Sequence, residues 1–300
     1  FKATFDKQSG LLTSYIYKKQ EYIHNGQGPQ PFFWRAPTDN DYGAKLPTRL
    51  KAWREASYQT PKAESFNVSK DGDKSIVKVT YRFPQVDAQW EITYKVFANG
   101  IIKVDNRFVA EGTETPMIPR VGLRMQLSEI LNDLTYYGRG PEENYRDRRT
   151  SQFIGEYTTL IKDLYEPYIR PQENEHRTDI YWCALTTKQK AGLLFIADRT
   201  FELNASNYLL GSLDSGETID NGAPRTNETN HRHLTDPQPV KQVDMFIDYR
   251  MMGVGGDNSW GAIAHEPYLI RPGVENAIEY GFSIVPFDKK ADYKNLIYQY

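Results

Sequence analysis

Paired carboxylates are the first residues in this sequence that could do chemistry. Hydrolysis of a glycosidic bond uses two carboxyl groups, about 5–5.5 Å apart for retention of configuration and about 6.5–9.5 Å apart for inversion. Local pairs occur at Asp39 with Asp41, at residues 142–143, and at Glu173 with Glu175. Acidic side chains are mostly solvated surface groups, so spacing alone assigns none of these pairs as an acid and base.

Histidine and cysteine offer little further chemistry. His231 and His233 are two residues apart, so on a strand both rings would share one face and could bind a metal ion. No third ligand matches them, and structural or exposed histidines are the better interpretation. Cys183 lies in an apolar run and is interpreted as a core residue. The sequence lacks the HExxH, GxSxG, CxxC and phosphate-loop patterns, so no metal site is predicted.

Two segments are rich in residues that form turns and shape loops. In the first, Arg35 precedes Asp39, Asn40, Asp41 and Gly43. Asp and Asn side chains bond to their own backbone, and glycine accepts a positive φ. One interpretation is a self-capped surface loop with Arg35 paired to a neighbouring carboxylate. The other is a loop that borders a ligand cleft, with Gly43 as a hinge.

The second segment spans residues 252–261, and three glycines, at positions 253, 255 and 256, precede Asp257, Asn258 and Trp260. The glycines allow a sharp turn and close approach to other backbone. A tryptophan on such a loop is flanked by small and polar residues, and loops on a rigid scaffold often carry binding residues. We expect Asp257 and Asn258 to fix the turn that orients the indole. Trp260 either binds a ligand or caps the end of the fold.

The elements that must position these loops are predicted to be strands. Hydrophobic residues alternate with polar ones over 77–83, 90–96, 102–108, 121–127, 243–249 and 278–284, and residues 192–197 form a continuous apolar run. Asn99-Gly100 is a hairpin signal. The best helix candidate is 48–56, and residues 26–45 and 136–179 are interpreted as long irregular stretches. The pattern predicts an all-β protein, a large antiparallel sandwich bigger than an immunoglobulin-type domain.

Composition excludes some classes of partner. The 300 residues carry a formal net charge of −2, without the basic excess of nucleic-acid-binding proteins. No run approaches the roughly 20 apolar residues of a membrane span. Three Asn-x-Ser/Thr triplets, at Asn67, Asn204 and Asn227, are of a kind that arises by chance. The chain starts at Phe1 in patterned sequence, so we expect a fragment of a longer polypeptide. The sequence specifies neither compartment nor oligomeric state.

Several segments together resemble one known family, and they occur in its order along the chain. The sequence is similar to the C-terminal small-chain domain of family 2 glycoside hydrolases of the lacZ-type β-galactosidase group. The stretches that carry the resemblance are residues 5–12, 35–43, 137–145, 147–148, 165–168, 171–174, 228–234 and 252–260. Each stretch alone is weak, and the combination is specific.

The resemblance implies one domain over residues 1–300, a super-sandwich similar to galactose mutarotase. It implies that both catalytic glutamates lie in a preceding TIM barrel, and that the barrel and more N-terminal domains hold Mg²⁺ and Na⁺. Trp260 would reach the galactoside pocket, the loop after Gly43 would act as a lid, and the full enzyme would often be a homo-oligomer. This sequence departs from relatives at Asn258, where Asp is common, and over residues 44–47, which leaves the aglycone preference open.

Two alternatives stay open beside a fragment that is expected to be inactive by itself. A stand-alone carbohydrate-binding module needs aromatic platforms but no acid and base. An aldose 1-epimerase-like protein needs a histidine and a glutamate as proton shuttles in one cleft.

Overall fold

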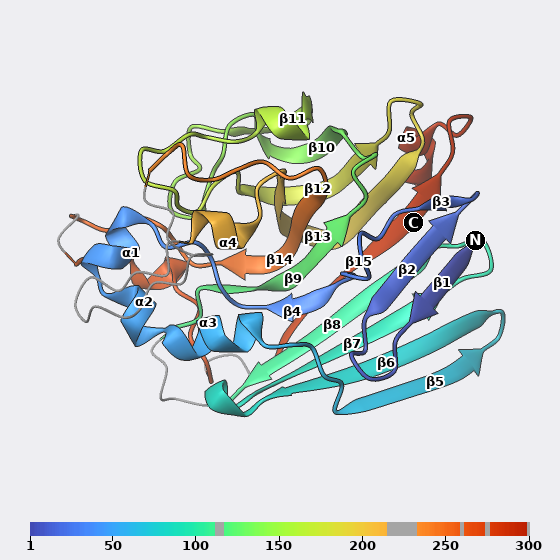
Figure 1. Ribbon diagram of the computed structural model, residues 1–300, viewed down its shortest axis with the longest axis horizontal. Coiled ribbons are helices and arrows are strands. Elements are labelled where there is room, and N and C mark those ends of the chain that lie inside the picture. Colours follow the sequence, from blue (N-terminus) through green and yellow to red (C-terminus); the bar gives the residue numbers. More distant parts are fainter. Residues whose placement is uncertain (112–116, 215–232, 259–260, 274–276, 299–300) are drawn as a thin grey trace.

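The chain is an all-β protein, as predicted. The computed structural model (Figure 1) describes residues 1–111, 117–214, 233–258, 261–273 and 277–298. The strands in these residues are β1 (Lys2–Phe5), β2 (Leu12–Tyr17), β3 (Gln20–Glu21), β4 (Gln30–Phe32), β5 (Ser65–Asp71), β6 (Lys74–Phe83), β7 (Ala88–Val96), β8 (Ile102–Ala110), β9 (Arg120–Leu127), β10 (Asp133–Gly140), β11 (Phe153–Leu160), β12 (Arg177–Thr186), β13 (Gly192–Ser206), β14 (Val243–Met251) and β15 (Ile278–Phe287). The short helices are α1 (Asp39–Gly43), α2 (Leu46–Arg49), α3 (Lys51–Tyr58), α4 (Leu210–Leu213) and α5 (Tyr293–Leu296).

Strand β13 joins two parts of one antiparallel sheet. Its first half pairs with β15, from Gly192 to Ala197, and its second half pairs with β14, from Glu202 to Ser206. The sheet therefore forks. One path runs β11-β10-β12-β13-β15-β8-β7-β6-β5, and the other continues from β14 to β9 and β4. In Figure 1, β4, β9 and β14 lie between the upper strands β10–β12 and the lower strands β5–β8.

The core fills the space between the two branches. Phe33, directly after β4, is fully buried, and its ring centroid lies 4.9 Å from that of Phe83, 5.1 Å from Trp53, 5.4 Å from Phe108 and 5.6 Å from Trp90. Such close, tilted aromatic pairs add to the free energy gained by burying their area. Segments far apart in the sequence are thereby fixed around one ring.

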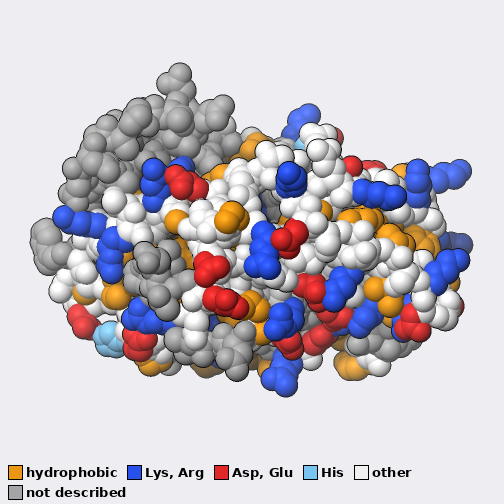
Figure 2. Space-filling view, turned by 90° about the horizontal axis from the view of Figure 1, so that it is seen from below, with side chains coloured by type: hydrophobic (Ala, Val, Ile, Leu, Met, Phe, Trp, Pro, Cys, Tyr) orange, Lys and Arg blue, Asp and Glu red, His pale blue; other side chains and the backbone are white. Residues whose placement is uncertain are grey.

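The small sheet β1-β2-β3 and the helices cover this framework. Phe5 packs edge-on against Tyr94 at 5.0 Å, and the Tyr15 hydroxyl donates to the Gly100 carbonyl at 2.5 Å. Lysine, arginine, aspartate and glutamate side chains lie close together over much of the face shown in Figure 2. None of the helices in the part of the chain that the structure describes has the length and hydropathy to cross a lipid bilayer.

The strands predicted from alternation are confirmed, and Cys183 is a buried core residue. The predicted helix over 48–56 corresponds to the end of α2 and most of α3. The prediction of long irregular stretches is wrong: residues 26–45 contain β4 and α1, and residues 136–179 contain β11. Gly43 ends α1 and is not among the described glycines with positive φ. Periodicity fails for α1 because one turn of helix is too short to show it.

Candidate functional site

Arg35 and helix α1 form one side of the site. Thr38 caps the helix: its hydroxyl accepts from the Asp41 amide at 3.2 Å, and its own amide donates to Asp41 Oδ2 at 3.0 Å. The same carboxylate takes two bonds from the buried Arg35, Nε to Oδ2 at 3.0 Å and Nη2 to Oδ1 at 2.7 Å. This reciprocal cap stabilises the short helix, and the fork-to-fork ion pair fixes its orientation.

The glycine segment, residues 252–256 directly after β14, is bound to Arg35 and helix α1. Arg35 Nη1 donates to the Met252 carbonyl at 2.6 Å, and Nη2 donates to the Gly253 carbonyl at 3.1 Å. Asn40 Nδ2 donates to the Val254 carbonyl at 3.1 Å. Three successive carbonyl groups are thus held by two side chains that precede them by more than 200 residues. The two segments singled out in the sequence lie side by side.

Asp147 holds the same segment from its amide side. Its carboxylate accepts from the Val254 amide at 3.1 Å and from the Gly255 amide at 2.7 Å. A Cβ added to Gly253 would lie 2.5 Å from Asp147 Oδ2 and 2.8 Å from the Ala264 Cβ. The position therefore requires glycine, because real Cβ atoms do not approach so closely. Carbonyls and amides of residues 252–255 are bound on both sides, which makes the segment a rigid base.

Asp257 and Asn258 follow this base directly in the chain. Asp257 is exposed, and its carboxylate is 2.9 Å from His265 Nε2. Asn258 is exposed, and Trp260 lies outside the described residues. The Asp39 amide donates to Gln172 Oε1 at 3.2 Å, while its carboxylate is 4.0 Å from Arg170.

A hollow of about 140 Å³ lies beside these segments. Its wall brings together α1, the glycine segment and the loops between β10 and β12. The lining residues are Thr38, Asp39, Asn40, Tyr145, Arg148, Tyr168, Gln172, Glu173 and Val254. Hydroxyl, amide, carboxylate and guanidinium groups converge there with two aromatic rings, a set that can bind a small polyhydroxylated molecule.

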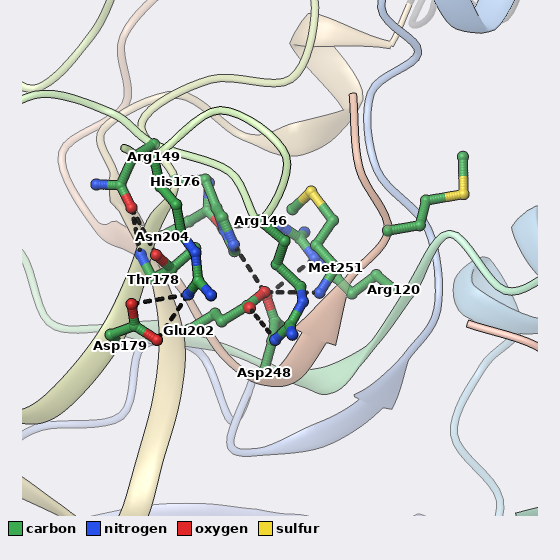
Figure 3. A network of polar contacts seen from close by, with 12 residues as sticks. Arg120, Arg146, Arg149, His176, Thr178, Asp179, Glu202, Asn204, Asp248 and Met251 are labelled. Atoms are coloured by element: carbon green, nitrogen blue, oxygen red, sulfur yellow. Dashed lines mark hydrogen bonds and ion pairs between the residues drawn. The ribbon is translucent and has the colours of Figure 1, made fainter. Parts of the chain in front are cut away.

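A buried polar network lies behind the hollow (Figure 3). His176 is fully buried, with Nδ1 2.8 Å from Asn204 Oδ1 and Nε2 3.0 Å from Glu202 Oε2. Asn204 Oδ1 also accepts from Arg120 at 2.7 Å. Arg120 Nε faces Asp248 Oδ2 at 3.1 Å as an ion pair that lacks the alignment of a hydrogen bond. The network connects β9, β12, β13 and β14 inside the fold.

Burial and charge compete over the protonation of this network. Burial alone would lower the pKa of His176, but the hydrogen bond and charge of Glu202 outweigh it and raise that pKa. Burial raises the pKa of Asp248 to about 7, although Arg120 and His176 oppose the shift. Burial likewise raises the pKa of Glu175 to about 8, against the hydrogen bond from Ser206.

Each carboxylate pair noted in the sequence has at least one member that is already bound by other side chains. Asp41 binds Arg35, and Glu143 accepts from Arg148 at 2.5 Å and from Tyr168. Glu173 accepts from Asn204 at 2.9 Å, and Glu175 accepts from Ser206 at 3.1 Å. The structure thus gives no reason to assign any of these carboxylates as an acid or nucleophile.

The chain matches known proteins over most of its length. Residues 1–284 match the family model described as beta galactosidase small chain. The chain belongs to this family. Curated relatives are beta-galactosidases: that of Priestia megaterium is 33% identical over 270 residues, which make up 90% of this chain and 24% of the relative. That of Lactobacillus delbrueckii subsp. bulgaricus is 32% identical over 273 residues, 90% of this chain and 25% of the relative.

The chain spans about a quarter of the length of the curated relatives it matches. Among solved structures, it is similar to a GalM/aldose epimerase homologue from C. elegans, with a TM-score of 0.41 and 9% identity, covering 92% of this chain and 78% of that one. Galactose 1-epimerase from Lactobacillus acidophilus has a TM-score of 0.41 and 8% identity, covering 74% and 66%. Nothing further rests on these two likenesses.

The sequence does not indicate the roles of several residues at this site. Asp147 stands in a stretch that matched the family, yet nothing in its type or spacing points to the glycine segment more than 100 residues later. In the sequence, Asn204 stands only in an Asn-x-Ser/Thr triplet of a kind that arises by chance. In the structure it is buried and bonds Arg120, Glu173 and His176.

The raised pKa of Glu175 makes the stability of the small chain dependent on pH. Its folded-state pKa of about 8 exceeds the ordinary value of 4.5, so the stability from its bound proton is fully present below pH 4.5 and is lost as pH rises through about 8. Glu175→Gln cannot ionise. We expect it to reduce the fall in unfolding free energy between pH 5 and 8, by up to about 1.4 kcal/mol per pH unit.

Urea unfolding at half-unit pH steps measures this difference. Glu55→Gln, on the exposed side of α3, is the matched control and should leave the slope as it is in the parent chain. Parallel curves for the parent and Glu175→Gln would show that Glu175 does not titrate in this window.

Proposed function

We propose that this chain is the C-terminal domain of a β-galactosidase and forms one wall of its galactoside pocket. The observation that carries the proposal is the rigid base at residues 252–255, bound by Arg35, Asn40 and Asp147. A segment held on both sides can present the residues that follow it in a fixed position. Those residues are Asp257, Asn258 and Trp260, and we assign Trp260 as the platform against the sugar.

The proposed chemistry is divided between domains. Two carboxylates outside this chain would hydrolyse the terminal β-D-galactoside with retention, through a covalent galactosyl intermediate. Trp260 would offer a flat apolar face to the ring and the aglycone. Such contact stabilises ground state and transition state alike, so it lowers KM more than it raises kcat.

The chain that follows Gly43, with helix α2, is proposed as the lid-like part of the wall. A Cβ placed on Gly261 would lie 3.3 Å from the Gly43 carbonyl oxygen, so the chain returns from the glycine segment beside the end of α1. Pro47 stands in the first turn of α2 and restricts its backbone. We expect this lid to move as a short rigid unit rather than as a loop hinged at Gly43.

The proposal places its other partners outside these residues. A preceding TIM-barrel domain would contribute the reacting carboxylates, and it and more N-terminal domains would hold Mg²⁺ and Na⁺. Within the described ranges, no three His, Cys, Asp or Glu side chains gather so as to hold a metal ion, and no step of the proposal uses one here. The full enzyme is proposed to be a homo-oligomer.

Kinetics of Trp260→Ala in the full-length enzyme test the platform. We expect KM for nitrophenyl galactoside to rise about ten-fold, with a much smaller fall in kcat, because the lost contact acts on substrate and transition state equally. Trp260→Phe keeps a flat ring and should recover much of the loss. A fall in kcat at unchanged KM would contradict the platform role.

The chain by itself is expected to show no turnover in the same assay. Activity that survives repurification and is abolished by changing one local glutamate would contradict the division of labour between domains.

An epimerase activity is less well supported. It needs an accessible histidine and glutamate in one cleft. His176 is paired with Glu202, but it is fully buried and both ring nitrogens are engaged.

A stand-alone carbohydrate-binding module differs in affinity: it would bind galactose or lactose at a Kd of the order of 1 mM or better, whereas one wall of a pocket would bind far more weakly. Titration calorimetry separates the two.

A further inference from the structure

A cleft in the described part of the chain lies away from the glycine segment, at the fork of the sheet. Strand β13 stops pairing with β15 at Ala197 and starts pairing with β14 at Glu202. The residues between them are unpaired in those two ladders, and residues 198–200 are exposed. The separation leaves a cleft of about 840 Å³, within the roughly 300–1,000 Å³ usual for small-molecule sites.

The cleft is polar on every side. It is lined by carboxylates, guanidinium groups, hydroxyls and a few aromatic rings. Six of the lining residues are aspartate or glutamate and four are arginine. Such a lining gives an apolar ligand little to contact. It differs in this respect from most small-molecule pockets, which are predominantly apolar.

Neither sign of charge dominates the lining. Asp105 pairs with Lys95 at 2.8 Å, Glu279 lies 3.6 Å from Arg107, and Asp179 accepts from Arg149 at 2.7 Å. A strongly anionic ligand would meet six carboxylates, and a strongly cationic one would meet four guanidinium groups. The balance favours a neutral ligand that can both donate and accept hydrogen bonds.

The floor of the cleft is fixed from behind. Glu202 is buried, and its Oε2 accepts from the Met251 amide at 2.7 Å and faces His176 Nε2. Its Oε1 receives Arg146 at 3.4 Å (Figure 3). Because its rotamer is held by three groups, the Glu202–Arg146 pair is ordered before any ligand arrives. Preorganised polar groups cost less entropy on binding than mobile ones.

Aromatic rings complete the wall on the β14 side. Tyr249 and Tyr280 lie with ring centroids 6.2 Å apart, and the Tyr280 hydroxyl donates to the Ile247 carbonyl at 3.1 Å. Arg250 lies over the Tyr249 ring at 4.9 Å. Flat rings beside planar charged groups match a pyranose, which has apolar C–H faces and a rim of hydroxyls.

We propose that this cleft is a second saccharide site, distinct from the proposed galactoside pocket. Its ligand class is a neutral oligosaccharide, bound by carboxylates that accept from ring hydroxyls and guanidinium groups that donate to them. The cleft and the hollow beside Asn40 have no lining residue in common. The inference therefore does not depend on the galactosidase assignment.

Saturation-transfer NMR on this chain tests the site with galactotetraose, cellotetraose and maltotetraose as probes. We expect at least one to bind with a Kd of the order of 1 mM. Arg199→Gln and Glu279→Gln remove exposed lining groups on β13 and β15 and should each weaken binding about ten-fold. Arg82→Gln, which removes an exposed ion pair with Glu64 outside the cleft, is the matched control and should bind as the parent does.

Trp260→Ala should also bind the tetrasaccharide as the parent does, which separates this site from the galactoside pocket. The proposal is overturned if no probe binds, if both wall variants bind unchanged, or if Trp260→Ala abolishes binding. Tighter binding of inorganic phosphate than of every saccharide would likewise overturn it, in favour of an anion site. Circular dichroism of each variant confirms that its fold is retained.

Discussion

Replacing Arg35 by methionine should lower the free energy of unfolding of this chain by about 3–5 kcal/mol. The guanidinium is buried with the Asp41 carboxylate and also serves the Met252 and Gly253 carbonyls. Burial alone would lower the pKa of Arg35, and the charge of Asp41 raises it overall. Without Arg35, a buried carboxylate and two carbonyls lose their partner, which costs more than the methionine gains by packing.

Urea unfolding with a conservative and an exposed control checks this result. Arg35→Lys keeps the charge but cannot bind a carboxylate through two parallel bonds, so its loss should be intermediate. Arg82→Met breaks an exposed pair with Glu64 and should cost at most about 1 kcal/mol. Equal, small losses for Arg35→Met and Arg82→Met would show that the buried pair does not hold the two segments together.

Gly253→Ala should lower the unfolding free energy by about 1–3 kcal/mol and impair the full-length enzyme more severely. The added Cβ would lie 2.5 Å from Asp147 Oδ2 and 2.8 Å from the Ala264 Cβ. Either Asp147 releases the Val254 and Gly255 amides or the whole segment shifts. Since misplacement by about 1 Å can cost about 100-fold, we expect KM for galactosides to rise by up to that factor.

Gly211→Ala is the matched control for this substitution. No atom lies within 4 Å of a Cβ placed there, and the residue is in helix α4, where alanine is favoured over glycine by about 0.5–1 kcal/mol. The two variants add the same methyl group and should move stability in opposite directions. If both leave stability and KM unchanged, the contact between Gly253 and Asp147 has no role in positioning the segment.

Alternation predicts the strands of this fold but not what covers their polar faces. In β14, Val243, Met245 and Ile247 alternate with Asp244 and Asp248, and all five residues are buried. The two aspartates pair with Arg124 and Arg120 of the neighbouring β9. Period-two patterning reports side-chain direction only, so buried ion pairs between β9 and β14 are invisible to it.

One part of the candidate site could be predicted because its residues are close together in the sequence. Arg35 and Asp41 were singled out together because they are close in sequence, and the structure places them in one ion pair. The helix that holds them could also have been found, since Thr38 precedes Asp41 by three residues in the pattern of a capping box. The bonds from Arg35 to Met252 and Gly253 span more than 210 residues, and no local pattern encodes such a pairing.

The pairing of strand β13 with both branches of the sheet determines how the domain unfolds. One edge of the 15-residue strand pairs with β12 from Gly192 to Leu203, and the other edge pairs with β15 at one end and with β14 at the other. Neither branch of the sheet therefore keeps its central strand if the other one melts, and we expect heat or denaturant to disrupt the domain in a single cooperative step. Residues 198–200 are exposed like a surface loop, but an insertion there would shift the register of one branch against the other.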